Sequence, residues 1–349
     1  MALFSRFGKN EKRLLGGTAS VLVIGAVFVF VLPRIADYRD VWDVVKELGW
    51  EEWLFLIGAT VLNIATFPPS WMVALPGLRY REALAMTQAS TALSMISPAG
   101  AAVGLGASYG MLRSWGFDGR PVGLAVAVTG IWNQLANLTF PIVALALLTG
   151  EDQDHPALRT AALVGVGILV VSLTAFALAL SSAARARRIG DLAVRLARRV
   201  GRLFRKDVRW SGEGLVSFRS GALGLLRRRW HVLTIATLVG HLTVFVLLLA
   251  CVRAVGVASS EITWIEAFAA WSLVRILGAL PLTPGGIGIV ELGLSGALVA
   301  FGAPNADAVA ATLLYRALTV LPTLGLGMLA AATWRTHHPG QPLESPGDP

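Results

Sequence analysis

The sequence predicts an all-α polytopic membrane protein with about six full spans and two helical hairpins broken by proline and glycine. Hydrophobic residues make up 55% of the 349 residues, and the mean hydropathy is +0.66. Several apolar runs reach the roughly 20 residues that an α-helix needs to cross about 30 Å of hydrocarbon. The single cysteine, Cys251, lies inside such a run, so no intramolecular disulfide is expected. This composition is typical of membrane proteins rather than of soluble domains.

Six apolar runs are long enough to span a bilayer. They are residues 14–32, 53–75, 121–148, 157–180, 232–255 and 306–334. Shorter or Pro/Gly-interrupted stretches occupy residues 82–96, 99–112 and 262–301. A basic N-terminus, residues 1–13, precedes the first run, and the tail, residues 335–349, has a composition typical of disorder. We therefore predict one transmembrane domain over residues 14–334.

Positive charge gathers on one side of the predicted spans. Residues 185–229 contain fourteen Lys and Arg against three acidic residues, so this segment is expected in the cytoplasm. The acidic turn at 151–154 then falls outside, and both termini fall in the cytoplasm of a cell-membrane protein. Apolar residues recur at helical spacing between 189 and 204, which predicts an amphipathic helix that binds anionic inner-leaflet head groups. A solvated charged hairpin is the alternative, and nucleic-acid binding is disfavoured because aromatic residues do not alternate with the basic ones.

The chain contains a weak internal duplication, with halves at about 82–148 and 266–334. Ser97-Pro98-Ala99-Gly100 corresponds to Thr283-Pro284-Gly285-Gly286. Further matching pairs flank these motifs: Glu82 with Glu266, and Gly116 with Gly302. The charge pattern sends the two units through the bilayer in opposite directions, which predicts an inverted repeat. Broken helices at matching places in an inverted repeat indicate a transporter's central site, because unpaired backbone groups must line a cavity or be buried in protein.

The most specific motif lies in the second unit. It is Pro281-Leu-Thr-Pro-Gly-Gly-Ile-Gly-Ile-Val-Glu291, followed by Tyr315-Arg316 in the next span. These residues resemble the lysylphosphatidylglycerol synthase transmembrane family, also called the flippase-like family, over about residues 14–334. The segment Tyr109-Gly-Met-Leu-Arg113-Ser-Trp-Gly116 is similar to the family's first-half pattern, but Ala99 stands where a glycine is usual, so the first half is expected to be the less functional one.

The resemblance implies a multi-span protein that takes part in lipid modification or in moving a lipid between leaflets. Some family members carry a cytosolic aminoacyltransferase domain. Only a short tail follows Trp334 in this sequence. We therefore expect a stand-alone membrane domain, without aminoacyl transfer and with no privileged place for lysyl-lipid as the substrate.

Ionisable residues inside spans are costly and by default face the bundle interior with a partner. Glu291 is expected to pair with Arg275 or Arg316 and to leave the other arginine for a lipid phosphate, or to carry protons. A purely structural ion pair is the alternative. Half-helix N-termini at the breaks would also favour an anion. The candidate substrate-binding residues are Arg316, Arg275, Glu291, Tyr315, Pro284, Gly285, Gly286, Gly288, Pro98, Gly100 and Arg113.

Other polar residues within spans allow two interpretations. Asn133, Gln134 and Asn137 lie at helical spacing and either line a polar pathway or bond neighbouring helices. His241 is expected to be a packed residue with a single hydrogen bond. The sequence contains no phosphate loop, zinc-protease motif or Cys/His cluster, so we expect no metal, no cofactor and no catalytic residue.

These observations favour a flippase-like transporter of an anionic lipid or lipid-linked substrate. One alternative is a membrane-embedded transferase acting on polyprenyl-linked or phospholipid substrates, which the basic cytoplasmic face disfavours. Another is a non-transporting partner that recruits a separate lipid-modifying enzyme through residues 185–229. The expected partners are membrane lipids, together with a second copy of the chain or such an enzyme, and no nucleic acid.

Overall fold

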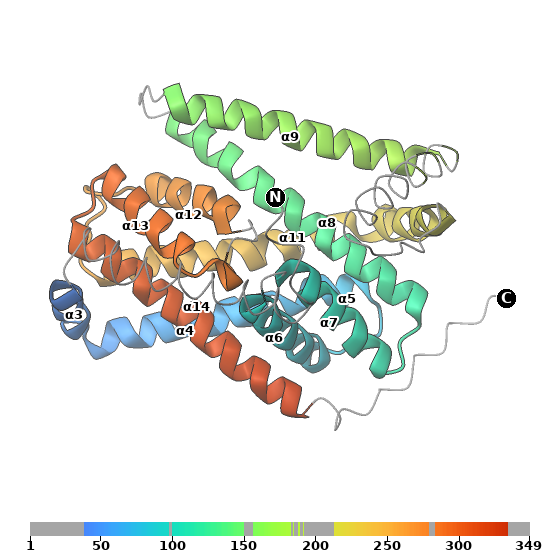
Figure 1. The fold of residues 1–349 in the computed structure, drawn as a ribbon, viewed down its shortest axis with the longest axis horizontal. Coiled ribbons are helices and arrows are strands. Elements are labelled where there is room, and N and C mark those ends of the chain that lie inside the picture. The colour runs from blue at the N-terminus through green and yellow to red at the C-terminus, as the bar shows by residue number, and fades with distance from the viewer. Residues whose placement is uncertain are drawn as a thin grey trace, which may run out of the picture.

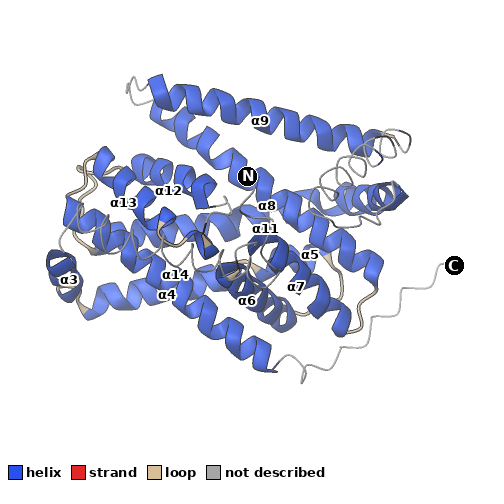
Figure 2. Cartoon of the chain, in the orientation of Figure 1, coloured by secondary structure: helices blue, strands red, loops and turns tan. Residues whose placement is uncertain are grey.

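A computed structural model describes residues 38–97, 100–149, 156–182, 184, 188, 191, 213–278 and 283–333. Within these residues the chain folds into helices joined by short turns, and no strand is present (Figures 1 and 2). The predicted fold class is confirmed: the chain is an all-α polytopic membrane protein. The basic N-terminus at 1–13, the first predicted span at 14–32, Pro98 and the tail at 335–349 lie outside the described residues.

The helices follow the predicted apolar runs. Their bounds are α3 Tyr38–Lys46, α4 Trp50–Thr66, α5 Pro68–Ala74, α6 Tyr80–Ile96, α7 Gly100–Ser114, α8 Gly119–Thr149, α9 Pro156–Ser181, α11 Glu213–Ala254, α12 Trp264–Gly278, η3 Pro284–Gly286, α13 Ile289–Phe301 and α14 Asn305–Thr333. Five segments of the described chain are long and apolar enough to cross a membrane: Trp50–Ala74, Gly119–Leu148, Phe218–Ala254, Pro284–Phe301 and Asn305–Thr333. A shorter apolar helix, Leu163–Leu178, lies within α9.

The basic segment predicted as a loop over 185–229 is shorter than expected. Helix α11 starts at Glu213 and continues for 42 residues, so residues 213–229 belong to the same helix as the following span. The reason is a set of small and apolar residues at helical spacing among the arginines. Ala222 is fully buried in a cluster with Val128 of α8 and Leu233, which holds the start of α11 against the bundle. Most of residues 185–212 lie outside the described part of the chain.

The two predicted repeat units share their local geometry. A glutamate caps the first helix of each unit: Glu82 accepts the Arg79 amide at 3.0 Å, and Glu266 accepts the Thr263 amide at 2.8 Å. The second helix of each unit ends on a left-handed glycine, Gly116 with φ 90° or Gly302 with φ 119°. The closing hydrogen bonds match as well: Phe117 to Leu112 at 3.3 Å, and Ala303 to Leu298 at 3.1 Å.

The units pack reciprocally. Helix α6 of the first unit packs along α14, the last span of the second unit, whereas α12 of the second unit packs along α8, the last span of the first. In Figure 1, α8 runs from the right end of the molecule to the left, and α14 runs from left to right. Reciprocal packing with opposite directions is the arrangement that an inverted repeat produces.

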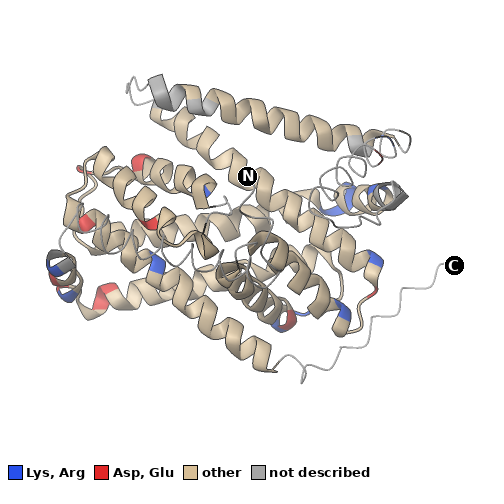
Figure 3. Cartoon of the chain, viewed as in Figure 1, with Lys and Arg blue, Asp and Glu red and all other residues tan. Residues whose placement is uncertain are grey.

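The two ends of the bundle carry different charge. Figure 3 shows Lys and Arg gathered at the right end, where α7 ends and α8 and α11 begin, while most of the acidic residues lie towards the left. We call these the basic end and the acidic end. Glu51 and Glu52 of α4 and Asp307 of α14 belong to the acidic end, and Arg113 and Arg120 belong to the basic end.

Candidate functional site

A large cavity lies between the two broken hairpins. Its volume is about 1460 Å³, and α4 to α9, α11, the end of α12, η3 and α14 all contribute to its walls. The lining residues of α8 run from Gly123 to Leu138, and those of α4 are near its C-terminus. The cavity therefore occupies the part of the bundle nearer the basic end. It is larger than the roughly 300–1,000 Å³ typical of small-ligand pockets, so a lipid head group and part of its chains fit.

Four aromatic side chains lie beyond the lining residues, on the acidic side of the cavity. Phe140 lies just beyond the lining residues of α8, Phe245 lies one turn beyond His241 on α11, and Phe268 and Trp271 lie on α12. All four are buried, and the ring centroids of their contacting pairs are 5.0–6.0 Å apart. They belong to the largest buried apolar cluster. Passage towards the acidic end would require this cluster to open.

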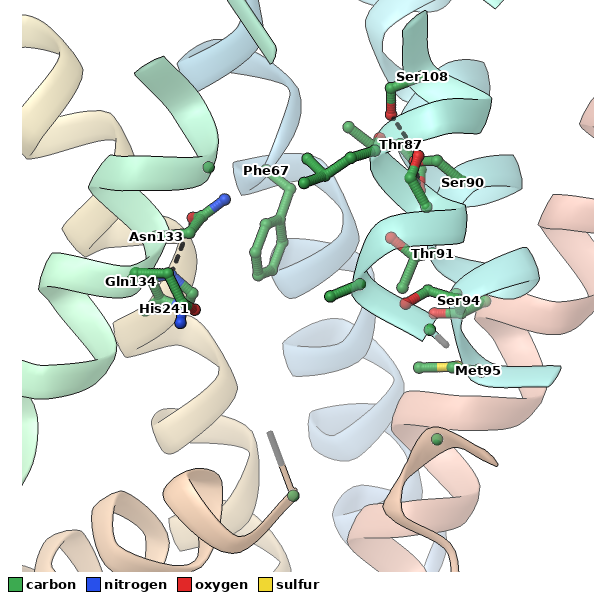
Figure 4. Close-up of a pocket in the computed structure, with 18 of the residues that line it drawn as sticks. Phe67, Thr87, Ser90, Thr91, Ser94, Met95, Ser108, Asn133, Gln134 and His241 are labelled. Atoms are coloured by element: carbon green, nitrogen blue, oxygen red, sulfur yellow. Dashed lines mark hydrogen bonds between the residues drawn. The ribbon is translucent and has the colours of Figure 1, made fainter. Parts of the chain in front are cut away.

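Polar side chains face one another across the cavity (Figure 4). One wall is a row of hydroxyl groups on α6, which we call the hydroxyl row: Thr87, Ser90, Thr91 and Ser94. The opposite wall carries Asn133 and Gln134 from α8 and His241 from α11, and Phe67 projects between the two walls. The hydroxyl spacing of three and four residues places the row on one face of the helix.

An ion pair lies where the second hairpin is broken. The Arg316 Nε lies 2.7 Å from the Glu291 Oε1, and the Arg316 Nη2 donates to the Gly285 carbonyl at 3.1 Å. The other Glu291 oxygen accepts the Gly288 amide at 2.6 Å. Arg316 lines the cavity with 14% of its side chain exposed, and Glu291 lies behind it. Among the described residues, the remaining Arg316 nitrogen, Nη1, has no hydrogen-bond partner.

Arg275 forms a second, separate cationic site behind the amide wall. Its guanidinium donates to the Asn137 Oδ1 at 2.8 and 3.1 Å and to the His241 Nδ1 at 2.8 Å, and it lies 4.8 Å from the Trp271 ring centroid. The His241 Nε2 bonds the Asn133 Oδ1 at 3.1 Å. Because Nδ1 accepts from a guanidinium, Nε2 carries the ring proton. No carboxylate of the described chain forms an ion pair with Arg275.

Glycine is required at the tip of each hairpin, and Gly285 also lies against the end of α6 in the other hairpin. Gly285 has φ 62°, and a Cβ there would lie 3.0 Å from the Met95 carbonyl oxygen at the end of α6. A Cβ on Gly100 would lie 2.5 Å from the Ser94 carbonyl oxygen, a distance that real Cβ contacts do not reach. The first turn of α7, from Gly100 to Ala102, lines the cavity. The start of α13 differs from the start of α7, because the Gly288 amide at the start of α13 is bonded by Glu291 of the same helix.

The family model for the lysylphosphatidylglycerol synthase TM region matches residues 18–327. The chain belongs to this family. No curated protein matches the chain. Membership of the lysylphosphatidylglycerol synthase TM family makes the chain a multi-pass membrane protein related to proteins of lipid modification and flipping. The matched region includes the whole cavity, whose lining residues run from Asn63 to Thr323.

The structure brings most of the candidate residues to the cavity or directly behind it. Those that line the cavity are Gly100, Gly285, Gly286, Tyr315 and Arg316. Those that lie behind this lining are Arg275, Pro284, Gly288 and Glu291. Of the two arginines that could pair with Glu291, the structure selects Arg316. Pro98 lies outside the described residues, although its neighbours Ser97 and Gly100 line the cavity.

The positions of Arg113 and His241 differ from those predicted. Arg113 is exposed at the end of α7, where it donates to the Phe117 carbonyl at 2.6 Å, and it does not reach the cavity. Its position next to a helix C-terminus explains this, because basic side chains there bond the last carbonyls. His241 is bonded through both ring nitrogens rather than one.

Several cavity residues were not singled out from the sequence. Gln88 and Thr283 are 6% and 5% exposed, line the cavity, and have side-chain oxygens without a hydrogen-bond partner among the described residues. The hydroxyl row was also missed, although its spacing on α6 is visible in the sequence. The polar residues of α8 serve both predicted purposes: Asn133 and Gln134 line the cavity, and Asn137 bonds Arg275 of the neighbouring helix.

Proposed function

We propose that this chain is a flippase-like transporter that moves an anionic lipid or lipid-linked molecule across the cell membrane. The observation that carries the proposal is the cavity between two hairpins broken at matching places, with aromatic rings beyond it on one side and a guanidinium where the hairpins meet. Broken helices of an inverted repeat surround the substrate in many secondary transporters. Family membership agrees with a lipid as the substrate class.

The charge of the cavity favours an anion. Arg316 is the one charged residue among the described lining residues, and Arg275 lies behind the amide wall. Glu291 neutralises one of these two arginines. Charges act strongly in a low-dielectric interior, so the remaining positive charge attracts a phosphate and repels a cation.

The charge of the bundle ends supports an orientation with the basic end in the cytoplasm. The cavity then faces the cytoplasmic half of the membrane, and the aromatic cluster closes the outer half. Transport requires the cavity to close towards the cytoplasm while the aromatic cluster opens towards the outside. The reciprocal packing of α6 on α14 and of α12 on α8 permits such a change. Helices α7 and α8 both contribute lining residues, and Ala101 and Leu105 of α7 are exposed at the edge of the cavity, where acyl chains can extend into the bilayer.

The rival functions make different demands on the cavity. A transferase acting on a lipid phosphate needs acidic residues for a metal or for general-base catalysis, and no carboxylate is among the described lining residues. A partner that only recruits an enzyme needs no cavity at all. Blocking the cavity therefore distinguishes transport from recruitment.

We expect Gly123→Leu to reduce lipid exchange in liposomes to the rate of protein-free vesicles. A Cβ at Gly123 meets nothing within 4 Å, so the new side chain fits without a backbone clash and extends into the cavity that this glycine lines. The measurement is the leaflet exchange of fluorescent phosphatidylglycerol, followed by chemical quenching of the outer leaflet.

The matched control for this variant is Gly110→Leu. A Cβ at Gly110 also meets nothing within 4 Å, but this glycine is exposed and does not line the cavity. Exchange with Gly110→Leu should equal that of the wild type. If the wild-type protein does not accelerate exchange, or if both variants exchange lipid equally well, the proposed transport function is wrong.

A further inference from the structure

The cavity has two chemically distinct parts. One, which we call the floor, is the Arg316 guanidinium, and the other consists of the hydroxyl and amide side chains of the walls. We infer that it selects lipids whose anionic head group also carries several hydroxyls, such as a polyol or sugar phosphate, and rejects head groups with an added cation. This inference rests on the proposed function and specifies its substrate class. It separates the chain from the cationic lysyl-lipid that gives the family its name.

The floor of the cavity is suited to a phosphate. The free Arg316 Nη1 carries two N–H groups at the cavity lining, and the Nε and Nη2 of the same guanidinium are held by Glu291 and Gly285. A guanidinium fixed in this way loses little freedom when it binds an anion. A lysyl ammonium group at the same place would meet no carboxylate among the described lining residues and would be repelled by Arg275, which forms no ion pair within the described chain.

The walls of the cavity are suited to hydroxyl groups. Thr87 and Ser90 donate their own protons to backbone carbonyls of α6 at 2.8 and 3.2 Å, so their oxygens remain as acceptors. Thr91 and Ser94 have no hydrogen bond within the described residues and are able to donate as well as accept. Side chains of this kind match sugar or polyol hydroxyls, which are themselves both donors and acceptors.

Two buried side-chain oxygens without partners, one of them the acceptor Gln88 Oε1, point to a ligand that forms hydrogen bonds. Gln88 and Thr283 are lining residues that are more than nine-tenths buried, and the Gln88 Oε1 and the Thr283 Oγ1 have no partner among the described residues. Buried polar atoms are normally bonded, and leaving them unsatisfied is unfavourable. A bare phosphate diester has no proton to donate to the Gln88 Oε1, which only accepts, whereas a polyol phosphate has several. The hydroxyls of the head group therefore supply what the phosphate lacks.

The remaining lining is apolar and fits the lipid part of such a molecule. Leu105 of α7 faces the α8 side, within 3.8 Å of where a Cβ of Gly130 would lie, and Ile131 and Leu135 continue the same wall. Leu105 is 38% exposed, so its side chain is open to contact with an acyl chain. A free polyol phosphate makes no use of this wall, and we therefore infer a lipid rather than its water-soluble head group.

Competition binding tests the head-group preference without requiring transport. The full chain, in phosphatidylcholine nanodiscs, is crosslinked to a photoactivatable phosphatidylglycerol in the presence of unlabelled competitors. We expect phosphatidylinositol to compete about tenfold better than phosphatidic acid, the factor expected from two additional hydrogen bonds. Lysylphosphatidylglycerol should not compete, and water-soluble inositol phosphate should compete only weakly.

Each result of this assay decides a part of the inference. Equal competition by phosphatidic acid and phosphatidylinositol would overturn the role of the hydroxyls, and competition by lysylphosphatidylglycerol would overturn the exclusion of cations. Strong competition by inositol phosphate would show that the lipid chains are not recognised. Because binding is measured apart from exchange, a protein that exchanges lipid without this preference contradicts the inference alone, and one that shows the preference without exchange contradicts the transport function.

The double variant Thr91→Val and Ser94→Ala assigns the preference to the hydroxyl row. It removes two hydroxyls that form no hydrogen bond within the described chain and leaves Arg316 in place. The tenfold advantage of phosphatidylinositol should disappear while phosphatidic acid binds as before. The matched control is Thr139→Val, since Thr139 lies on α8 outside the lining and bonds only the Leu135 carbonyl, at 2.8 Å. An equal loss for both lipids would indicate a merely structural role and would contradict the assignment.

Discussion

Arg316→Ala is expected to abolish lipid exchange and to destabilise the fold by about 3–5 kcal/mol, the usual cost of leaving a buried charge without its partner. Glu291 is 3% exposed, and its Oε1 would lose the guanidinium that lies 2.7 Å away. The Gly285 carbonyl would lose its hydrogen bond at the same time. Thermal unfolding in detergent measures the stability, and leaflet exchange in liposomes measures the activity.

A neutral replacement of the pair separates folding from function. In the double variant Arg316→Met and Glu291→Gln no buried charge is left, so most of the stability should return. Exchange should remain absent because the cavity has lost the guanidinium. Arg113→Ala is the matched arginine control: Arg113 is exposed and lies away from the cavity, so both stability and exchange should be those of the wild type. Normal exchange by the double variant would show that the Arg316 cation has no part in transport.

Gly327→Leu is expected to have the largest effect on packing. A Cβ at Gly327 would lie 2.4 Å from the Ala92 Cβ and 2.8 Å from the Gln88 carbonyl oxygen, so α6 and α14 touch through this glycine. Inserting a side chain into such a contact costs about 1–3 kcal/mol or more. It also pushes α6, with its hydroxyl row, away from α14. We expect a lower unfolding temperature and loss of exchange.

Gly325→Leu provides the control on the same helix. Gly325 is exposed, and a Cβ there would meet nothing within 4 Å. This variant has the same composition and the same helix propensity as Gly327→Leu, so it should unfold and exchange lipid as the wild type does. If the two variants unfold at the same temperature, the close contact between α6 and α14 does not exist in the membrane.

The spans were predictable because long apolar runs end at charges or at turn residues. The run 121–148 became α8, Gly119–Thr149, and the run 306–334 became α14, Asn305–Thr333. The start of α11 was not predictable from hydropathy, since Ala222 and its apolar neighbours lie among arginines and glycines. Local burial against α8, rather than the average composition, decides where this helix begins.

The candidate site was predictable in its parts but not in its pairings. The Pro/Gly breaks identified η3 and the start of α7, because broken helices in hydrocarbon must be buried or line a cavity. The choice of Arg316 over Arg275 as the partner of Glu291 depends on how α13 packs against α14. Arg275 bonds Asn137, 138 residues earlier in the chain, and His241, 34 residues earlier, and no spacing rule relates such positions.

The hydroxyl row illustrates the opposite case. Its spacing was visible in the sequence, yet serine and threonine also occur in helices where they bond only their own backbone, as Thr87 does. What gives the row a function is the space in front of it. That space exists because α6 packs on α14 while α8 stands opposite, and such an arrangement is a property of the whole bundle.

Lipid is expected to pass through the cavity between the two hairpins. Reversible chemical blocking of this cavity, with exchange measured before and after on the same protein preparation, tests this most directly. Gly123→Cys places a thiol in the cavity, while the natural Cys251 is fully buried, so the wild type controls for background reaction. A bulky disulfide-forming reagent on Gly123→Cys should reduce exchange to the rate of protein-free liposomes, and reduction should restore it. Undiminished exchange by the fully modified protein would show that lipid does not pass through this cavity.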